Sequence, residues 1–184
     1  AICRDAGVDT FCVTEVSDAK QLRDAGFTQD ILMIRPTCDV DEVHQLLDLS
    51  VILTVSSPDD AAVLNGIATQ RKQRIHAHVE IDTGMGRYGF LPSELDKLIH
   101  LYSYMDGLEL CGIYTHFHSA FCNKKATDLQ MVAFRSVIRQ LQEKGFDVGV
   151  CHCCNSAGLL RFPNYAMDAV RVGSAILGRL SFKG

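Results

Sequence analysis

Several side chains that could bind a ligand follow apolar, strand-like runs from about position 80 onward. They are Arg87 in "DTGMGRYG", His116 in "THFHSA", Asn155 and Ser156 in "CNSAG", and Arg171 in "RVGSA". Arg171 falls inside a short apolar run, where a buried guanidinium needs an anionic group or a hydrogen-bond acceptor beside it. These residue types at the ends of strands predict a site for an anionic ligand.

Most of these residues also have a purely structural interpretation. Arg87 fits a surface arginine, although the flanking glycines would let the backbone approach a ligand closely. His116 fits a core histidine with a hydrogen-bond partner, and Asn155 followed by Ser156 fits a simple helix N-cap. Arg171 is the hardest of the set to explain by structure alone.

The stretch "VGSA" at 172–175 predicts a phosphate-binding turn. It opens a predicted helix, so Gly173 and Ser174 would present backbone N–H groups at a strand-to-helix turn, which is a typical anion site. The last two units of an α/β barrel commonly form a phosphate site. A phosphorylated ligand is therefore expected, while the residues alone do not identify the reaction.

Strands and helices that could position these groups alternate along the whole chain. The predicted strands are 8–14, 30–36, 50–56, 74–82, 107–117, 147–153 and 168–173, and the predicted helices are 16–26, 39–48, 58–70, 92–103, 125–145, 156–161 and one that begins at 174. Apolar runs alternating with helices favour a parallel sheet covered by helices.

The first nine residues read as the end of a helix with no strand before it. Seven strands plus one outside the chain predict a (β/α)8 TIM-type barrel with seven of its eight strands present, so residues 1–184 would form one partial barrel domain. A doubly wound sheet is the alternative, but it would normally carry a glycine-rich phosphate loop after an early strand.

The composition is that of an ordinary soluble globular protein. Among the 184 residues, 47% are hydrophobic and 22% charged, and the net charge of −4 gives no electrostatic reason to expect nucleic acid or an anionic membrane as partner. No apolar run is long enough to span a membrane. Cys151 and Cys154 form one C-x₂-C pair without a second, so we expect no metal site. Reduced core thiols, including Cys3, Cys12 and Cys111, are typical of a cytoplasmic protein.

Four motifs taken together resemble the alanine racemase family. They are "IDTGMGRYG" at 81–89, "THF" at 115–117, "NSAG" at 155–158 and "DAVRVG" at 168–173, and the early stretch "CVTEVSDAKQLRDAG" is also similar. The resemblance covers nearly the whole chain. It implies a pyridoxal 5'-phosphate enzyme built on an α/β barrel with a separate β-domain after it. The implied activity is the interconversion of L- and D-alanine, which supplies D-alanine for peptidoglycan.

The resemblance also implies a role for each motif residue. His116 would lie against the pyridine ring, and Arg171 would donate to the pyridine nitrogen without giving up its proton. The other cofactor contacts implied are Ser156 with the backbone of Gly173 and Ser174 at the phosphate, and Asn155 as their support.

Arg87 would reach the phenolic oxygen of the cofactor and the carboxylate of the substrate. Many family members carry, at the position of Glu80, a carbamylated lysine whose end becomes a carboxylate facing that arginine. Glu80 already has a carboxylate, and it shares one strand face with Asp82. We therefore hypothesise that Glu80 orients Arg87 directly.

Two catalytic groups of the family have no counterpart here. The Schiff-base lysine lies in a "KANAYGHG"-like first strand, and the second base is a tyrosine of the β-domain. Racemisation by two bases needs one on each face of the substrate carbon. The chain is thus expected to be an internal fragment that is inactive alone, and a homodimer is expected only of the full-length protein.

Substrate choice stays open. Leu177 stands where a tyrosine is frequent in the family. The stretch "THFHSAF" also differs from the commoner family pattern, in which an acidic ending follows "THF". A serine or broad-spectrum racemase shares the same barrel motifs, and a non-catalytic pyridoxal-phosphate-binding barrel is a further alternative. Aldolase-like or decarboxylase-like enzymes with this cofactor fit the motifs less well.

Overall fold

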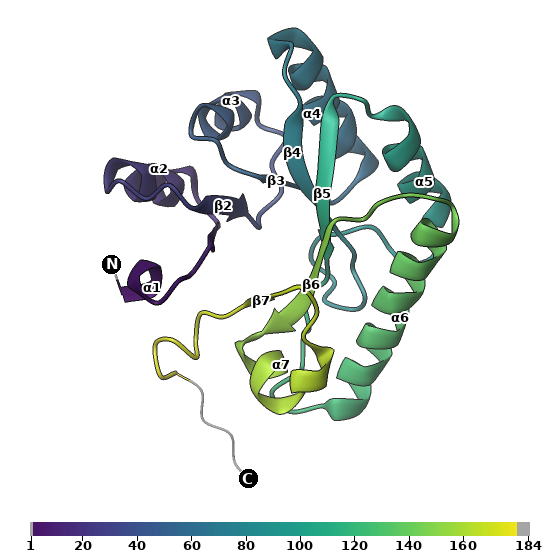
Figure 1. Cartoon of the computed structure of the whole chain (residues 1–184). Coiled ribbons are helices and arrows are strands. Elements are labelled where there is room, and N and C mark those ends of the chain that lie inside the picture. Colours follow the sequence, from purple (N-terminus) through teal and green to yellow (C-terminus); the bar gives the residue numbers. More distant parts are fainter. Residues whose placement is uncertain (1, 180–184) are drawn as a thin grey trace. The chain divides into compact units, whose positions relative to one another are not determined.

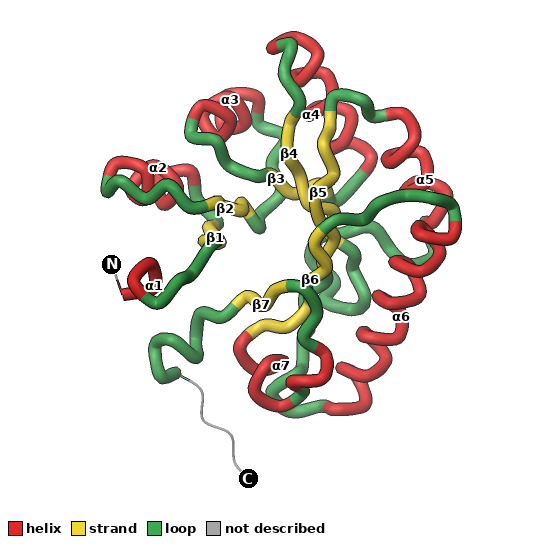
Figure 2. Tube along the Cα trace, in the orientation of Figure 1, coloured by secondary structure: helices red, strands yellow, loops and turns green. Residues whose placement is uncertain are grey.

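The computed structural model describes residues 2–179, in which short strands alternate with helices (Figures 1 and 2). The strands are β1 (Thr10–Val13), β2 (Asp30–Met33), β3 (Leu53–Val55), β4 (Ile75–Glu80), β5 (Leu108–Tyr114), β6 (Val150–Asn155) and β7 (Ala169–Arg171). The helices are α1 (Ile2–Asp5), α2 (Val16–Asp24), α3 (Val40–Asp48), α4 (Pro58–Arg71), α5 (Leu95–Tyr104), α6 (Lys124–Glu143) and α7 (Ser156–Arg161), followed by the 3₁₀ turn η1 (Pro163–Tyr165). Every predicted strand is found, generally shorter than expected.

The helix predicted to begin at Ser174 is not formed within the described residues. Positions 174–178 are consecutive turns instead. The backbone bonds there span different distances along the chain, from Leu177 N to Gly173 O (3.3 Å) and from Arg179 N to Ser174 O (2.9 Å). An α-helix needs a uniform four-residue spacing, so this pattern does not propagate one.

Strand order follows sequence order in both sheets. One sheet has the order β1-β2 and the other β3-β4-β5-β6-β7. Pairing is parallel between β1 and β2, between β5 and β6, and between β6 and β7. A doubly wound sheet reverses its order at a switch point, which the described strands do not do. Sequential parallel strands joined through helices are the topology that the sequence predicts.

The chain divides into two compact units, each with its own core. The N-terminal unit comprises residues 1–78 and 104–109, and the C-terminal unit residues 79–103 and 110–184. Fully buried side chains of the N-terminal unit include Ile31, Leu32, Met33, Leu46, Leu53, Leu64 and Ile75, and those of the C-terminal unit include Ile81, Phe90, Tyr114, Phe117 and Phe134. Every residue of the predicted site belongs to the C-terminal unit.

Helix starts carry the capping residues that the sequence indicates. Asp39 accepts a hydrogen bond from Glu42 N (2.8 Å) at the start of α3, and Ser57 accepts from Asp60 N (3.1 Å) at the start of α4. Pro58 occupies the first turn of α4, where a missing N–H does no harm. The caps therefore satisfy backbone donors that would otherwise lack partners.

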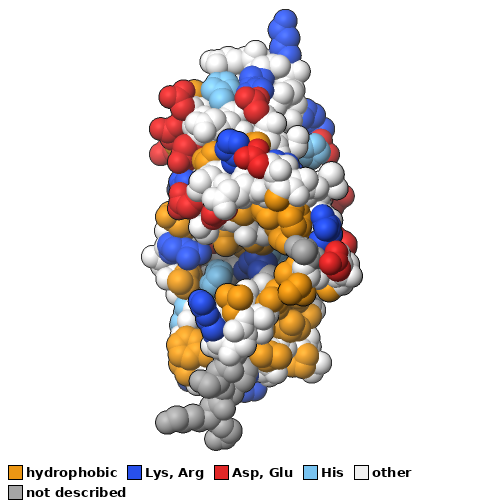
Figure 3. All heavy atoms as spheres, turned by 90° about the vertical axis from the view of Figure 1, so that its left-hand side faces the viewer, with side chains coloured by type: hydrophobic (Ala, Val, Ile, Leu, Met, Phe, Trp, Pro, Cys, Tyr) orange, Lys and Arg blue, Asp and Glu red, His pale blue; other side chains and the backbone are white. Residues whose placement is uncertain are grey.

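Charged side chains of both signs are interspersed on the face drawn in Figure 3. Between residues 2 and 179, no helix has the length and apolarity needed to cross a membrane. All eight cysteines are free thiols. The prediction that Cys12 is a core residue was wrong, because it is exposed on β1, where only Val13 is buried.

Candidate functional site

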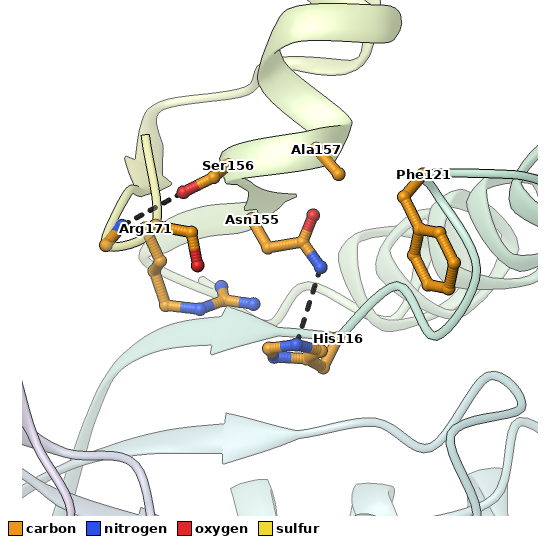
Figure 4. A pocket seen from close by; sticks show the side chains of 8 residues that line it. His116, Phe121, Asn155, Ser156, Ala157 and Arg171 are labelled. Carbon is orange, nitrogen blue, oxygen red and sulfur yellow. Dashed lines mark hydrogen bonds between the residues drawn. The ribbon is translucent and has the colours of Figure 1, made fainter. Parts of the chain in front are cut away.

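A cavity of about 380 Å³ opens in the C-terminal unit at the carboxyl ends of β5, β6 and β7 (Figure 4). Its lining residues are His116, Phe121, Asn155, Ser156, Ala157, Arg171, Gly173 and Ser174. Six of these are predicted site residues. Because parallel strands end at the same edge of a sheet, residues up to 58 positions apart in sequence, such as His116 and Ser174, meet around one space.

Asn155 acts both as a helix cap and as a site residue. Its Oδ1 accepts a bond from Gly158 N (2.9 Å) at the start of α7, as the structural interpretation predicts. Its Nδ2 donates to Phe117 O (2.9 Å) and lies 3.4 Å from Nε2 of His116 (Figure 4). The amide donor therefore faces a ring nitrogen that accepts. The cap thus holds the imidazole in place.

His116 is a neutral imidazole at neutral pH. Burial lowers the pKa of His116 to about 4, and the positive charges of Arg171 and Arg87 lower it further in the same direction. A neutral ring can lie flat against an uncharged ligand without the cost of burying a charge.

Arg171 is held on three sides by neutral groups. Its Nη1 lies 2.5 Å from Nδ1 of His152, and its Nη2 donates to Thr115 O (2.7 Å). The guanidinium carbon lies 4.9 Å from the centre of the Tyr114 ring, which itself stacks on His152 at 4.9 Å. These contacts fix the plane of the guanidinium beside the cavity.

Ser156 joins the start of α7 to the loop after β7. Its Oγ accepts bonds from the backbone N–H groups of Gly173 (3.0 Å) and Ala175 (3.2 Å). Since that oxygen accepts two bonds, its own hydrogen can be donated to a ligand. Nothing lies within 4 Å of the place where a Cβ would stand at Gly173. This wall therefore offers donors and open space, which suits a phosphate group.

The turn that carries Arg87 is closed by Asp82 and Gly89. The Asp82 carboxylate accepts bonds from Gly84 N (2.9 Å) and Gly86 N (3.0 Å). Gly89 has φ +116°, and a Cβ there would stand 2.5 Å from Asp82 N. Only glycine fits this close return of the chain. Arg87 itself is exposed and lies over the Tyr88 ring at 5.4 Å, so it is not part of the cavity wall.

Glu80 is a buried carboxyl group at the end of β4. It is 2% exposed, and its Oε2 has no hydrogen-bond partner among residues 2–179. Burial raises the pKa of Glu80 to about 7, against the opposing effects of a hydrogen bond to Tyr114 and the charges of Arg87 and Arg171. Within the described residues no hydrogen bond joins Glu80 Oε2 to Arg87, although the charge of Arg87 acts on the Glu80 carboxyl. The direct orientation that we hypothesised stays a prediction.

Sequence reasoning missed several residues that support the site. Tyr114, Thr115, His152 and Gln130 are all at most 2% exposed and all contact a predicted site residue. Gln130 had a detectable signal. It occupies a helical position whose neighbours at the same spacing, Thr127 and Phe134, are core residues, and a polar amide there needs partners.

These features define an α/β protein whose parallel strands end at a cavity with a phosphate-compatible wall, a neutral imidazole and a fixed guanidinium. Residues 1–181 match the family model described as alanine racemase, N-terminal domain. The chain belongs to the alanine racemase family, which is known for its use of pyridoxal phosphate. The resemblance predicted from the motifs is confirmed.

Alanine racemases from several organisms are similar to this chain. The one from Desulforamulus reducens is 36% identical over 180 residues, covering 96% of this chain and 48% of the relative. The one from Methanococcus maripaludis is 33% identical over 179 residues, again covering 96% and 48%. The chain spans about half the length of the curated relatives it matches.

Solved alanine racemase structures share the fold. The structure from Bacillus anthracis with bound L-Ala-P is 31% identical and has a TM-score of 0.86. The match covers 99% of this chain and 47% of the Bacillus anthracis chain. The structure from Clostridium difficile 630 is 28% identical with a TM-score of 0.87, covering 94% and 45%. The predicted TIM-type α/β fold is thereby confirmed.

Proposed function

We propose that the complete protein carrying this chain is a pyridoxal-phosphate-dependent alanine racemase, and that residues 1–184 form its cofactor-binding part. The observation that supports the proposal is that six residues of the family motifs line one cavity. The proposal includes a cytoplasmic homodimer that supplies D-alanine for peptidoglycan.

The chemistry of the cavity wall suits the phosphate and the ring of pyridoxal phosphate. Bound there, the cofactor withdraws electrons from the α-carbon of an amino acid and so makes its hydrogen acidic. Ser156 Oγ and the backbone N–H of Ser174 would hold the phosphate, while the N–H of Gly173 holds Ser156 Oγ in place. The neutral ring of His116 would pack on the pyridine. Arg171 would donate a hydrogen bond to the ring nitrogen while keeping its own proton, because a guanidinium does not deprotonate in proteins.

Arg87 would bind the substrate carboxylate, with Glu80 as its positioning residue. The acceptor Oε2 of Glu80 lacks a partner, and the Arg87 charge already stabilises the ionised carboxyl. Rotation of Arg87 away from the Tyr88 ring would let the guanidinium meet both carboxylates. Glu80→Gln is expected to raise the KM for L-alanine about tenfold with little change in cofactor affinity. An unchanged KM would contradict this role.

The two bases of racemisation would come from residues outside 1–184. The residues that line the cavity in the described part of the chain include no lysine. We therefore expect residues 1–184 alone to bind pyridoxal phosphate but to form no D-alanine.

The complete protein, supplied with pyridoxal phosphate and L-alanine, should form D-alanine, measured by coupled D-amino-acid oxidation. L-serine in a parallel assay tests the alternative substrate. Ser156→Ala should weaken cofactor binding about tenfold or more, because it removes a phosphate donor. Ser136→Ala is the matched control, since Ser136 lies on α6, away from the cavity lining, and its hydroxyl bonds to Gln140 of the same helix.

Two results would contradict parts of the proposal separately. A complete protein that binds no pyridoxal phosphate would overturn the cofactor site. D-alanine formed by residues 1–184 alone would overturn the assignment of both bases to residues outside this range.

A further inference from the structure

Gln130 places a carboxamide at the centre of the loops that follow β4 and β5. It belongs to α6 and is 2% exposed. Its Nε2 donates to Thr83 Oγ1 (3.1 Å) and to His116 O (3.1 Å), and its Oε1 accepts from His118 N (3.2 Å). A buried amide is costly unless it is hydrogen-bonded, and here both donors and the acceptor are used.

Through Thr83, the hydrogen bonds of Gln130 extend to Arg171 of β7. Its Oγ1 lies 2.7 Å from Oγ1 of Thr115, whose backbone carbonyl accepts from Nη2 of Arg171 at 2.7 Å. Thr83 also lies in the turn that carries Arg87, next to Asp82. One chain of hydrogen bonds therefore links that turn to the two groups assigned to the pyridine ring, His116 and Arg171.

Gln140 shows that α6 does not need such bonds to form. It lies ten positions further along the same helix, and its Nε2 donates to Ser136 O (3.1 Å) and Ser136 Oγ (3.2 Å). Both contacts stay inside α6. The bonds of Gln130, in contrast, all leave the helix for loops of the site, so they serve the geometry of those loops.

We infer that Gln130 is a positioning residue that fixes the turn bearing Arg87 relative to His116 and Arg171. The inference rests on the proposed function, in which Arg87 binds the substrate carboxylate while His116 and Arg171 bind the ring. Gln130 is not among the residues that line the cavity. Its effect is to hold the two binding regions at the spacing that one ligand molecule requires.

Two ligands separate this effect from general damage. Pyridoxine 5'-phosphate carries the ring and phosphate only, whereas N-(5'-phosphopyridoxyl)-L-alanine adds the amino-acid carboxylate. Both are titrated by calorimetry into the cofactor-free form of the complete protein. Gln130→Met should raise the Kd of the alanine adduct at least tenfold and that of pyridoxine phosphate less than threefold. Gln140→Met, the matched control, should change neither.

Thr83→Val provides a second route to the same result. It keeps the side-chain shape while removing the oxygen that bonds both Gln130 and Thr115. The same selective loss of the alanine adduct is expected, so the inference remains testable if Gln130→Met does not fold.

The outcomes distinguish this inference from the proposed function. Equal losses for the two ligands, or no loss for either, in the folded variants would overturn the positioning role of Gln130 alone. Failure of the unsubstituted protein to bind either ligand would overturn the proposed function and this inference with it.

Discussion

The strand ends of the two units carry similar polar residues but use them differently. In the N-terminal unit these groups bond to one another. Asp60 accepts from Cys38 Sγ (3.0 Å) and from Ser56 Oγ (2.6 Å), and Glu42 accepts from Arg35 Nη2 at 3.1 Å. The carboxylates are fully engaged by local partners. Residues that follow β2 and β3 thus stabilise helix starts and loops.

In the C-terminal unit the same kinds of residue bond to neighbours and still line a cavity. Asn155 caps α7 and also faces His116. The oxygen of Ser156 accepts a bond from the loop after β7, which leaves the hydroxyl hydrogen available for a ligand in the cavity. The type of the polar residues at a strand end therefore does not show whether that strand end belongs to a ligand-binding site. What defines it is whether their bonding leaves donors beside open space.

Two arginines give the sharpest form of the comparison. Arg23 on α2 donates to four backbone carbonyls, those of Phe27, Gln29, Leu49 and Ser50, at 2.8–3.1 Å. Arg171 is held over the Tyr114 ring and beside the cavity. One guanidinium is bonded to backbone carbonyls alone, and the other lines the cavity in which we propose that the cofactor binds.

The largest expected effect separates these two arginines. Arg23→Met should lower the free energy of unfolding by about 3 kcal/mol, because four carbonyls lose their donor. Arg171→Met should lower it by only about 1 kcal/mol but weaken pyridoxal phosphate binding strongly. Urea denaturation and cofactor titration of both variants measure this. Similar stability losses with unchanged cofactor binding would erase the distinction.

Opposite pH dependences of stability should distinguish Glu80 from His116 within the C-terminal unit. The folded-state pKa of Glu80 is raised to about 7 by burial, so its stabilising contribution is complete below its ordinary pKa of 4.5 and is lost as pH rises to about 7. The folded-state pKa of His116 is lowered to about 4, also by burial, so its contribution is complete above 6.5 and is lost as pH falls to about 4.

Glu80→Gln should therefore gain stability relative to the unsubstituted chain as pH rises from about 4.5 to 7. His116→Gln should gain relative stability as pH falls from about 6.5 to 4. Each difference should reach about 2 to 3 kcal/mol at most. Urea midpoints at half-unit pH intervals give the two difference curves. Flat or parallel curves would show that neither group titrates as the buried geometry implies.

The smallest expected effect concerns Cys38 of the N-terminal unit, whose thiol donates a hydrogen bond to Asp60. Burial against Asp60, a hydrogen bond to it and the charges of Asp60 and Asp59 raise the pKa of Cys38 to about 11. Only the thiolate reacts, although a thiol of higher pKa is intrinsically more nucleophilic. Cys38 and Cys122 are both exposed, so accessibility does not separate them. Cys38 should thus alkylate about tenfold more slowly than Cys122, as measured by mass spectrometry. Equal rates would mean that Asp60 does not hold the thiol.

Much of the fold was predictable because local patterns dictate it. The apolar runs give the seven strands, and caps such as Asp39 and Ser57 mark where helices begin. The prediction of a helix beginning at Ser174 was wrong because of a tertiary contact. Its neighbouring N–H groups at Gly173 and Ala175 bond to Ser156 Oγ, 17 and 19 positions away, so the local helix signal was overridden.

Which residues could form a site is readable from the sequence alone, because motif spacing and parallel topology require strand ends to converge. The sequence also determined the family. Only the tertiary structure decided that Tyr114, Thr115, His152 and Gln130 support the site, since their roles depend on distances between elements remote in sequence. The same holds for Arg87, whose guanidinium lies over the Tyr88 ring. Side-chain orientation follows from packing and hydrogen bonding in three dimensions, which a linear pattern does not contain.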